Sequence, residues 1–186
     1  MRKSYQYKLT PTPEQERALA EVVWCCRVLY NTALEQRLTW WRRGQGKSAT
    51  RFPQDAELQE LRAAFPEYAA IHRQVLQDVL ARRDRTYQAF FRRLASGEKP
   101  GFPRFHGRNR YHAFAYKAYG NGAHLENGSL MLSKIDRIAV RWLRPLAGTP
   151  KTVSRSREAD RWYVSCSCAE VSTQPVLPSE RALDQH

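Results

Sequence analysis

The residues best suited to chemistry lie in one stretch from Glu98 to Arg110, which reads EKPGFPRFHGRNR. It combines two prolines, two glycines, two phenylalanines and four Lys/Arg side chains. Proline lacks an amide donor and glycine loosens the backbone, so the stretch predicts a turn rather than a helix or a long strand. Aromatic rings between cations on a rigid loop can stack on bases and pair with phosphates. The alternative is a basic hinge in which Phe102 and Phe105 fill the core.

The surroundings of this stretch are also strongly basic. From Arg82 to Lys117 the chain has ten Lys/Arg side chains and two acidic ones, Asp84 and Glu98. A plain solvated helix face usually mixes both signs at i,i+4 spacing, so this region predicts a face that binds an anion. The candidate residues on this face and the turn are Arg82, Arg85, Arg92, Arg93, Lys99, Phe102, Arg104, Phe105, Arg108 and Arg110.

The charge of the whole chain points to the same class of partner. Its 186 residues include 31 Lys/Arg and 18 Asp/Glu, which gives a net charge of +13. Arginine is the commoner cation, and its guanidinium group can bind phosphate and guanine edges with two hydrogen bonds. Nucleic acid is therefore the expected partner. An anionic membrane surface is the weaker alternative, because it usually requires a polybasic amphipathic helix or a lipid anchor.

No targeting segment, membrane span or metal motif is expected. The N-terminus has no apolar run of the kind that a signal peptide needs, and no stretch approaches the length of a membrane helix. The cysteines form the pairs Cys25-Cys26 and Cys166-x-Cys168, which differ from the C-x-x-C pattern of zinc sites. We expect buried thiols in a reducing cytoplasm.

Other side chains with catalytic potential show no suitable arrangement. None of the histidines is paired with Cys or Asp at the spacing of a triad or a metal site, so we expect them to face solvent or RNA. These are His72, His106, His112, His124 and His186. The tryptophans lie mostly on or beside apolar stripes and are expected in the core. These are Trp24, Trp40, Trp41, Trp142 and Trp162.

Hydrophobic periodicity predicts one strand followed by helices. Alternation over residues 4–9 indicates a strand, after which Thr12, Pro13 and Gln15 form a capping box that starts a helix lasting to about Arg43. Two further helices are expected at about 55–64 and 68–96.

Beyond the turn the period changes to two and predicts four or so strands, with Asn127-Gly128 as a hairpin turn and residues 145–150 as another turn. The simplest topology pairs the first strand with these later strands. The expected fold class is therefore α+β, a split antiparallel β-barrel with an insertion of about three helices. The expected parts are 1–10 for the first strand, 11–97 for the helical lobe, 98–171 for the rest of the β-domain and 172–186 for a tail.

Five motifs in this order carry a family resemblance. They are YKLTPTPEQ at 7–15, RVLYNTALEQR at 27–37, the helix from Leu76-Gln77 to Phe90-Phe91-Arg92, GFPRF at 101–105, and GSLMLSKI followed by RWYVS. With them the chain resembles, along essentially its whole length, the N-terminal half of TnpB-type (OrfB) proteins, the RNA-guided nucleases of bacterial insertion sequences.

The resemblance implies a wedge-type β-barrel split by a helical recognition lobe, in a bacterial cytoplasmic protein that associates with the nucleoid when bound. In that family these parts cradle a guide RNA from the transposon end and read a short duplex motif beside the target DNA. The positions that contact this motif fall on Phe52, Gln54, Arg73 and Gln77, and the GFPRF segment lies near the RNA. Gln and Arg side chains can pair with adenine and guanine edges.

The family's RuvC-like nuclease would begin where this chain reads PSERALDQH and ends. Asp184 stands near the first expected carboxylate, but two-metal cleavage needs several carboxylates. We therefore expect no catalytic residue and no cofactor in this chain, with Mg²⁺ and structural Zn²⁺ belonging to the missing nuclease half. Three alternatives stay open: a module that binds guide RNA and target-adjacent DNA, an inactive or frameshifted fragment that needs a downstream or separate nuclease chain, and a generic basic RNA-binding protein.

Overall fold

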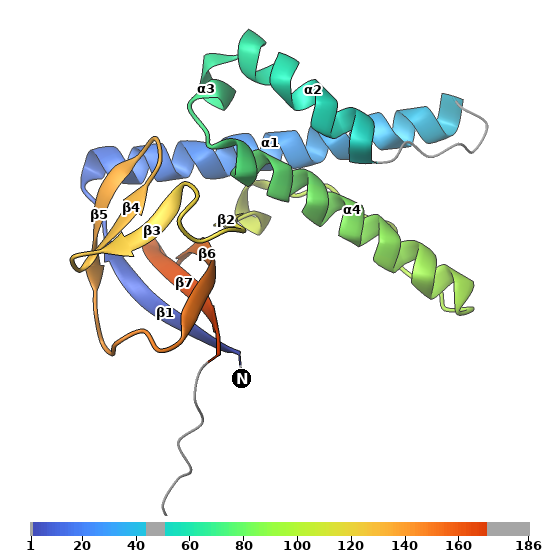
Figure 1. Ribbon diagram of the computed structural model, residues 1–186. Coiled ribbons are helices and arrows are strands. Elements are labelled where there is room, and N and C mark those ends of the chain that lie inside the picture. The colour runs from blue at the N-terminus through green and yellow to red at the C-terminus, as the bar shows by residue number, and fades with distance from the viewer. Residues whose placement is uncertain (1, 44–50, 171–186) are drawn as a thin grey trace, which may run out of the picture.

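The computed structural model describes residues 2–43 and 51–170, except for the side chains of residues 51–53. The fold consists of one strand, a group of helices and six further strands (Figure 1). The helical elements are α1 (Pro13–Arg43), α2 (Arg51–Ala64), α3 (Pro66–Ala69), α4 (Arg73–Ala95) and the short 3-10 helix η1 (Arg108–Arg110). The strands are β1 (Lys3–Thr10), β2 (Ala113–Tyr116), β3 (Ala123–Glu126), β4 (Ser129–Leu132), β5 (Asp136–Arg141), β6 (Thr149–Glu158) and β7 (Arg161–Ala169).

The first strand lies in the middle of the sheet. The strand order is β2-β6-β7-β1-β5-β4-β3, and all neighbours are antiparallel. β1 pairs with β7 from Lys3 opposite Cys168 to Lys8 opposite Tyr163, and its end pairs with β5. The sheet curls into a half-barrel (Figure 1). The predicted α+β class, with a β-domain split by helices, is confirmed.

Two predicted local features, the capping box and the hairpin turn, are confirmed by hydrogen bonds and backbone angles. Thr12 N donates to Gln15 Oε1 at 3.0 Å and Gln15 N donates to Thr12 Oγ1 at 3.3 Å, which is the reciprocal pattern of a capping box. Asn127 and Gly128 both have positive φ, 46° and 75°, as a two-residue hairpin turn between β3 and β4 requires.

Two helix boundaries differ from the expectation. The helix predicted at 68–96 is broken into α3 and α4, because His72 is extended (φ −62°, ψ 132°) and caps α4 by accepting a hydrogen bond from Gln74 N at 3.3 Å. α2 begins at Arg51 rather than 55, and Pro53 is tolerated because the first turn of a helix does not use its N–H groups.

The strand count is also higher than expected, since β3 and β6 were not predicted and β6 starts inside the turn expected at 145–150. β6 has the sequence TPKTVSRSRE, in which only Val153 and Arg155 are buried. An arginine at a core position conceals the apolar alternation that marks a half-buried strand.

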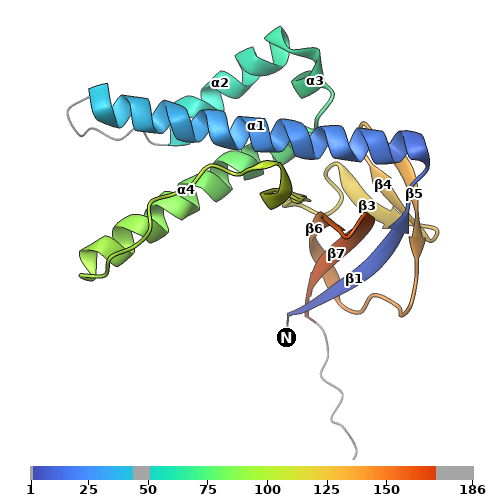
Figure 2. The ribbon, with the colours of Figure 1, turned by 180° about the vertical axis from the view of Figure 1, so that it is seen from behind.

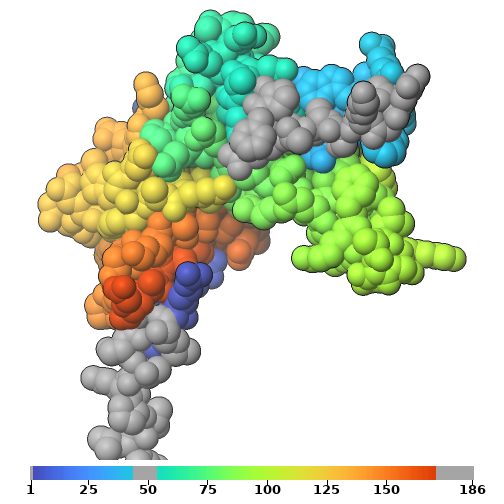
Figure 3. Space-filling view, turned by 45° about the vertical axis from the view of Figure 1, so that its right-hand side comes forward, coloured from blue at the N-terminus to red at the C-terminus, as the bar shows by residue number. Residues whose placement is uncertain are grey.

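Helices and sheet share one core and yet project in different directions. Buried side chains from α1, α4 and both halves of the sheet belong to one cluster, and Arg82 Nη1 donates to Ala113 O of β2 at 3.2 Å. Seen from behind, the segment after α4 runs back alongside that helix toward the sheet (Figure 2). The surface is hollowed between the projecting end of α4 and the sheet (Figure 3). None of the described helices combines the length and the apolar character that crossing a membrane requires.

A substitution at Gly122 tests how closely the sheet packs against the start of α4. A Cβ added there would lie 2.8 Å from ring atoms of both His72 and Tyr116, and its φ is +85°, whereas Gly120 has φ +87° and nothing within 4 Å. Gly120→Ala should therefore cost only the backbone strain, about 1 kcal/mol of unfolding free energy. Gly122→Ala should cost roughly 2–4 kcal/mol, because overpacking adds about 1–3 kcal/mol. Urea denaturation measures both, and equal losses would contradict this packing.

His72 makes stability depend on pH. Burial, and then the nearby Arg62 and Lys134, lower the pKa of His72 below its ordinary value of 6.5. The unfolded state then binds the proton more readily, so the stabilisation is present above pH 6.5 and is lost as pH falls through the lowered pKa. His72→Asn keeps a capping oxygen and cannot titrate.

The Tm of the His72→Asn variant should fall less than that of the wild type between about pH 7.5 and 5.5. Part of the fall should remain, because burial also lowers the pKa of His106. Parallel Tm curves for the two proteins would show that the cap of α4 is not the group that titrates.

Candidate nucleic-acid interface

The segment between α4 and η1, residues 97–107, is the feature on which the candidate interface depends, and we call it the strap. It contains no helix or strand, as predicted, whereas the last three residues of the predicted turn, Arg108–Arg110, form the 3-10 helix η1. Asn31 of α1 holds its end with two hydrogen bonds, from Asn31 Nδ2 to His106 O and from His106 N to Asn31 Oδ1, both 2.9 Å. The His106 ring also meets Tyr30 at a centroid distance of 4.5 Å. The strap is thereby fixed to α1.

The two phenylalanines of the strap behave differently. Phe102 packs edge-on against Phe90 and Tyr87 of α4, at centroid distances of 5.2 and 5.9 Å, yet 46% of it stays exposed. Phe105 is 49% exposed and has no contact with another described ring. Phe102 therefore anchors the strap to α4, while Phe105 is available to a ligand.

The far part of α4, the strap and η1 present most of the predicted cations to solvent. These side chains are exposed, and none of them pairs with an acidic residue in the described part of the chain. They are Arg92, Arg93, Lys99, Arg104, Arg108 and Arg110. Arg73 is exposed at the start of α4, about 28 Å from Arg92 along the helix axis. At 3.4 Å per phosphate, this length corresponds to about eight nucleotides of one strand.

Arg82, and more weakly the exposed Arg85, pair with an acidic residue of α4. The buried carboxylate of Asp78 lies 2.6 Å from Arg82 Nε, 3.8 Å from Arg85 Nη2 and 3.3 Å from Lys117 Nζ. Sequence reasoning missed Asp78, although its spacing of four residues from Arg82 was the available signal. Arg82, which also donates to Ala113 O, and Lys117, which follows β2, tie α4 to the sheet, whereas Arg85 pairs within α4. Whether Arg82 and Arg85 also contact nucleic acid stays a prediction.

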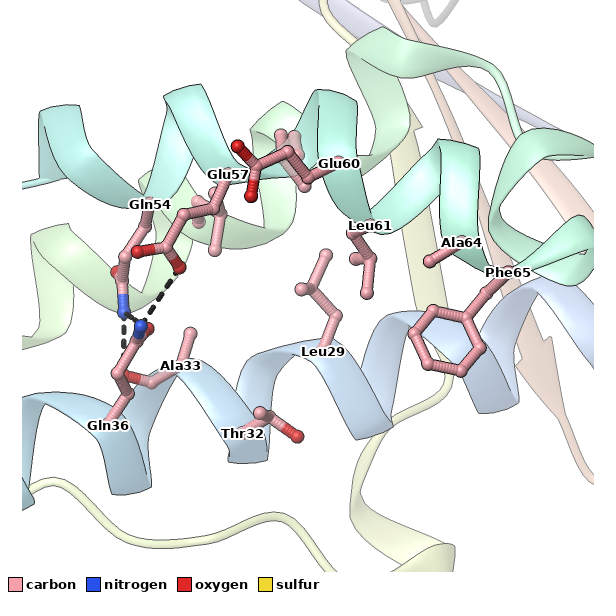
Figure 4. Close-up of a pocket in the computed structure, with 12 residues that line it drawn as sticks. Leu29, Thr32, Ala33, Gln36, Gln54, Glu57, Glu60, Leu61, Ala64 and Phe65 are labelled. Atoms are coloured by element: carbon pink, nitrogen blue, oxygen red, sulfur yellow. Dashed lines mark hydrogen bonds between the residues drawn. The ribbon is translucent and has the colours of Figure 1, made fainter.

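The residues predicted to read a target-adjacent motif are dispersed. Gln54 is buried in a groove between α1 and α2, where its Nε2 donates to Ala33 O at 3.1 Å and to Gln36 Oε1 at 2.6 Å (Figure 4). Gln36 in turn donates to Glu57 at 2.9 Å. Readout of a base by Gln54 would require these bonds to break. The prediction for Phe52 falls on a side chain outside the described residues.

Arg73 and Gln77 lie one turn apart on the first part of α4, with Arg73 exposed and Gln77 half-buried. Residues four apart on a helix lie on one face, so these two side chains can act together. Gln54 does not share this surface.

Two arginines of the basic chain are hidden from solvent. Arg83 is fully buried, and burial together with Arg37 lowers its pKa. Arg155 is also fully buried, with its guanidinium carbon 4.6 Å from the Phe114 ring centre and 4.7 Å from that of Tyr116, and burial lowers its pKa to about 10. These side chains contribute to the net charge but not to the surface that a ligand meets.

The expectation for the tryptophans is wrong at three positions. Trp24, Trp41 and Trp142 are exposed, the first two by about half, whereas Trp162 is buried. Trp24 and Trp41 lie on α1 beside its buried stripe rather than within it. The apolar periodicity of a helix locates its buried stripe, but it does not show which residues beside the stripe are buried.

The described residues do not fit a Mg²⁺ or Zn²⁺ site of the kind that the family's nuclease half would hold. Within residues 2–43 and 51–170 no three His, Cys, Asp or Glu side chains are grouped to bind a metal. The four cysteines are buried free thiols, and burial raises the pKa of Cys25 to about 11 and that of Cys166 to about 12. The described surface offers cations, amides and aromatic rings, whose common chemistry is the binding of nucleic acid.

Comparison with known proteins agrees with this chemistry. Residues 1–46 match the helix-turn-helix domain model of the OrfB proteins of the IS605 type. The described residues of this segment fold as β1 followed by the single long helix α1.

Two relatives match nearly the whole chain. A protein of Streptomyces pristinaespiralis, named as a proposed RNA-guided DNA endonuclease, is 31% identical over 183 residues, which cover 93% of this chain and 43% of the relative. InsQ of Escherichia coli (strain K12), with the same designation, is 31% identical over 185 residues, which cover 95% of this chain and 42% of InsQ. The chain thus spans less than half the length of these relatives. The chain is similar to the N-terminal part of these TnpB-type (OrfB) insertion-sequence proteins, as the sequence motifs predicted.

Proposed function

We propose that this chain binds a guide RNA from the end of its transposon, along α4, the strap and η1. The observation that carries the proposal is the row of exposed cations on the far part of α4, the strap and η1, which have no acidic partner among the described residues. Such cations release counterions when they meet phosphates, and this release drives nucleic-acid binding. Phe105, exposed beside Arg104, adds a ring on which an unpaired base can stack.

The second part of the proposal concerns duplex DNA beside the target. Arg73 and Gln77 supply one exposed guanidinium and one half-buried amide on the same face of α4. These groups can bind guanine and adenine edges in a major groove, while base pairing to the guide reads the rest of the target. The similarity to the RNA-guided relatives supports this role.

The third part is that the chain binds without cutting. The relatives are named for endonuclease activity, and this chain corresponds to 42–43% of their length. We propose that cleavage, with its Mg²⁺ and structural Zn²⁺, belongs to the remainder of such proteins or to a separate nuclease chain, and that the chain acts in the bacterial cytoplasm. The competing account is an inactive fragment of an endonuclease, and the partial coverage of the relatives is the observation that favours it.

Salt dependence of RNA binding tests the interface. Replacing Arg92, Arg93 and Arg104 by Ala should lower affinity for a transcript of the transposon end and reduce the slope of log K against log salt by about two units, at roughly 0.7 per lost phosphate contact. The matched control replaces three exposed arginines away from this face, Arg17, Arg141 and Arg161, and removes the same charge. Its slope should stay close to that of the wild type.

Equal slopes for the two triple variants would show that RNA binding reflects net charge and not this interface. A wild-type protein that binds the transcript no more tightly than an unrelated RNA would favour the account of an inactive fragment or a generic RNA-binding protein. Mg²⁺-dependent cleavage of plasmid DNA by the purified chain, with a contaminating nuclease excluded, would contradict the third part of the proposal.

A further inference from the structure

A small pocket lies where α1, the η1 region and the β6–β7 hairpin meet, at the η1 end of the row of exposed cations. We call it the junction pocket, and its volume is about 160 Å³. Its walls include Trp24, Arg27, Arg108, His112, Arg157 and Trp162. Pockets that enclose a drug-sized ligand have roughly 300–1,000 Å³. The junction pocket therefore suits one planar group that lies against its wall.

The charged side chains that line the junction pocket are arginines from three elements. Arg27 from α1, Arg108 from η1 and Arg157 from β6 line it, and none of the described residues that line it is acidic. Arg157 pairs with Asp160 at 2.7 Å, but both side chains are exposed, and exposed ion pairs are weak and exchange partners readily. Three elements thus bring guanidinium groups to one place that can hold a phosphate.

The same pocket contains aromatic rings and an unsatisfied donor. Trp24 lines the pocket and is 50% exposed, so part of its ring is open to a ligand. Trp162 is only 2% exposed, and its indole Nε1 is buried without a hydrogen-bond partner among the described residues. Buried donors without partners are rare in folded proteins and call for a ligand acceptor or water.

A ligand that matches all three observations has a planar ring, an anionic group and hydrogen-bond acceptors. An unpaired nucleotide has each of these, and unpaired RNA bases are commonly recognised by stacking on aromatic rings and arginine planes. We propose that the junction pocket binds one unpaired nucleotide of the RNA, with its base on Trp24 and its phosphate between Arg27, Arg108 and Arg157. This inference rests on the proposed function, because it assigns part of the same RNA to a second place on the chain.

The test compares the wild type with Trp24→Ala in binding single-stranded oligoadenylate and an RNA duplex of the same length. Loss of one stacking contact should weaken binding of the single strand by about 5- to 150-fold. Binding of the duplex, whose bases are already paired, should not change. Trp24→Phe should recover part of the affinity because it keeps a ring. The matched control is Trp142→Ala, which removes an exposed tryptophan that lines neither this pocket nor the one beside Phe102.

The slope of log K against log salt separates the role of the tryptophan ring from that of the arginines. Trp24→Ala should leave the slope unchanged, whereas Arg27→Gln should reduce it by about 0.7, the value for one phosphate contact on a single strand. An unchanged affinity of Trp24→Ala for the single strand, or an equal loss for strand and duplex, would overturn the assignment of the pocket. If the slope still depends on Arg92, Arg93 and Arg104, the proposed function survives that result.

Two further outcomes distinguish the sources of the nucleotide. AMP alone binding as tightly as oligoadenylate would make the pocket a site for a free nucleotide and would overturn the assignment to RNA. A wild-type chain that binds no RNA of any kind would remove the proposed function, and this inference with it.

Discussion

The structure depends on the pairing of β1 in the centre of the sheet. The first strand of the chain is bonded to β7 on one side and to β5 on the other, and both partners come from the last third of the sequence. The helices are therefore an excursion that starts two residues after β1 and must end beside the same sheet. The strap is the return path, and Asn31 fixes its end to α1. Pairing of the sheet thus positions the basic face.

The distribution of charge follows from this arrangement. Where the returning chain meets the sheet, cations stabilise the fold. Arg155 lies over the neighbouring rings of Phe114 and Tyr116, and Asp78 pairs with Arg82 and Lys117. Farther along α4 and the strap the cations have no described acidic partner and face solvent. The net charge of +13 therefore overstates what a polyanion meets, and the position of the cations relative to the core decides which ones can bind it.

The sequence was sufficient for features that local chemistry or strand order determines. The capping box at Thr12, the Asn127-Gly128 turn and the placement of β1 among later strands each follow from one strong signal. It was insufficient where tertiary contacts override periodicity. A buried arginine conceals β6, the cap by His72 divides a predicted helix, and the exposure of Trp24 depends on how α1 lies against the β6–β7 hairpin. Of the candidate interface, the exposed cations were predictable, whereas the pairing of Arg82 and Arg85 with Asp78 and the burial of Gln54 were not.

The most direct test of the central claim is to purify the chain from its host at moderate salt and to sequence the nucleic acid that accompanies it. If the sheet holds α4 and the strap as an RNA-binding face, one structured RNA from the end of the transposon should dominate the extract. An empty extract, or a random sample of cellular RNA, would contradict this account and would mean that the similarity to the RNA-guided relatives reflects ancestry without retained RNA binding.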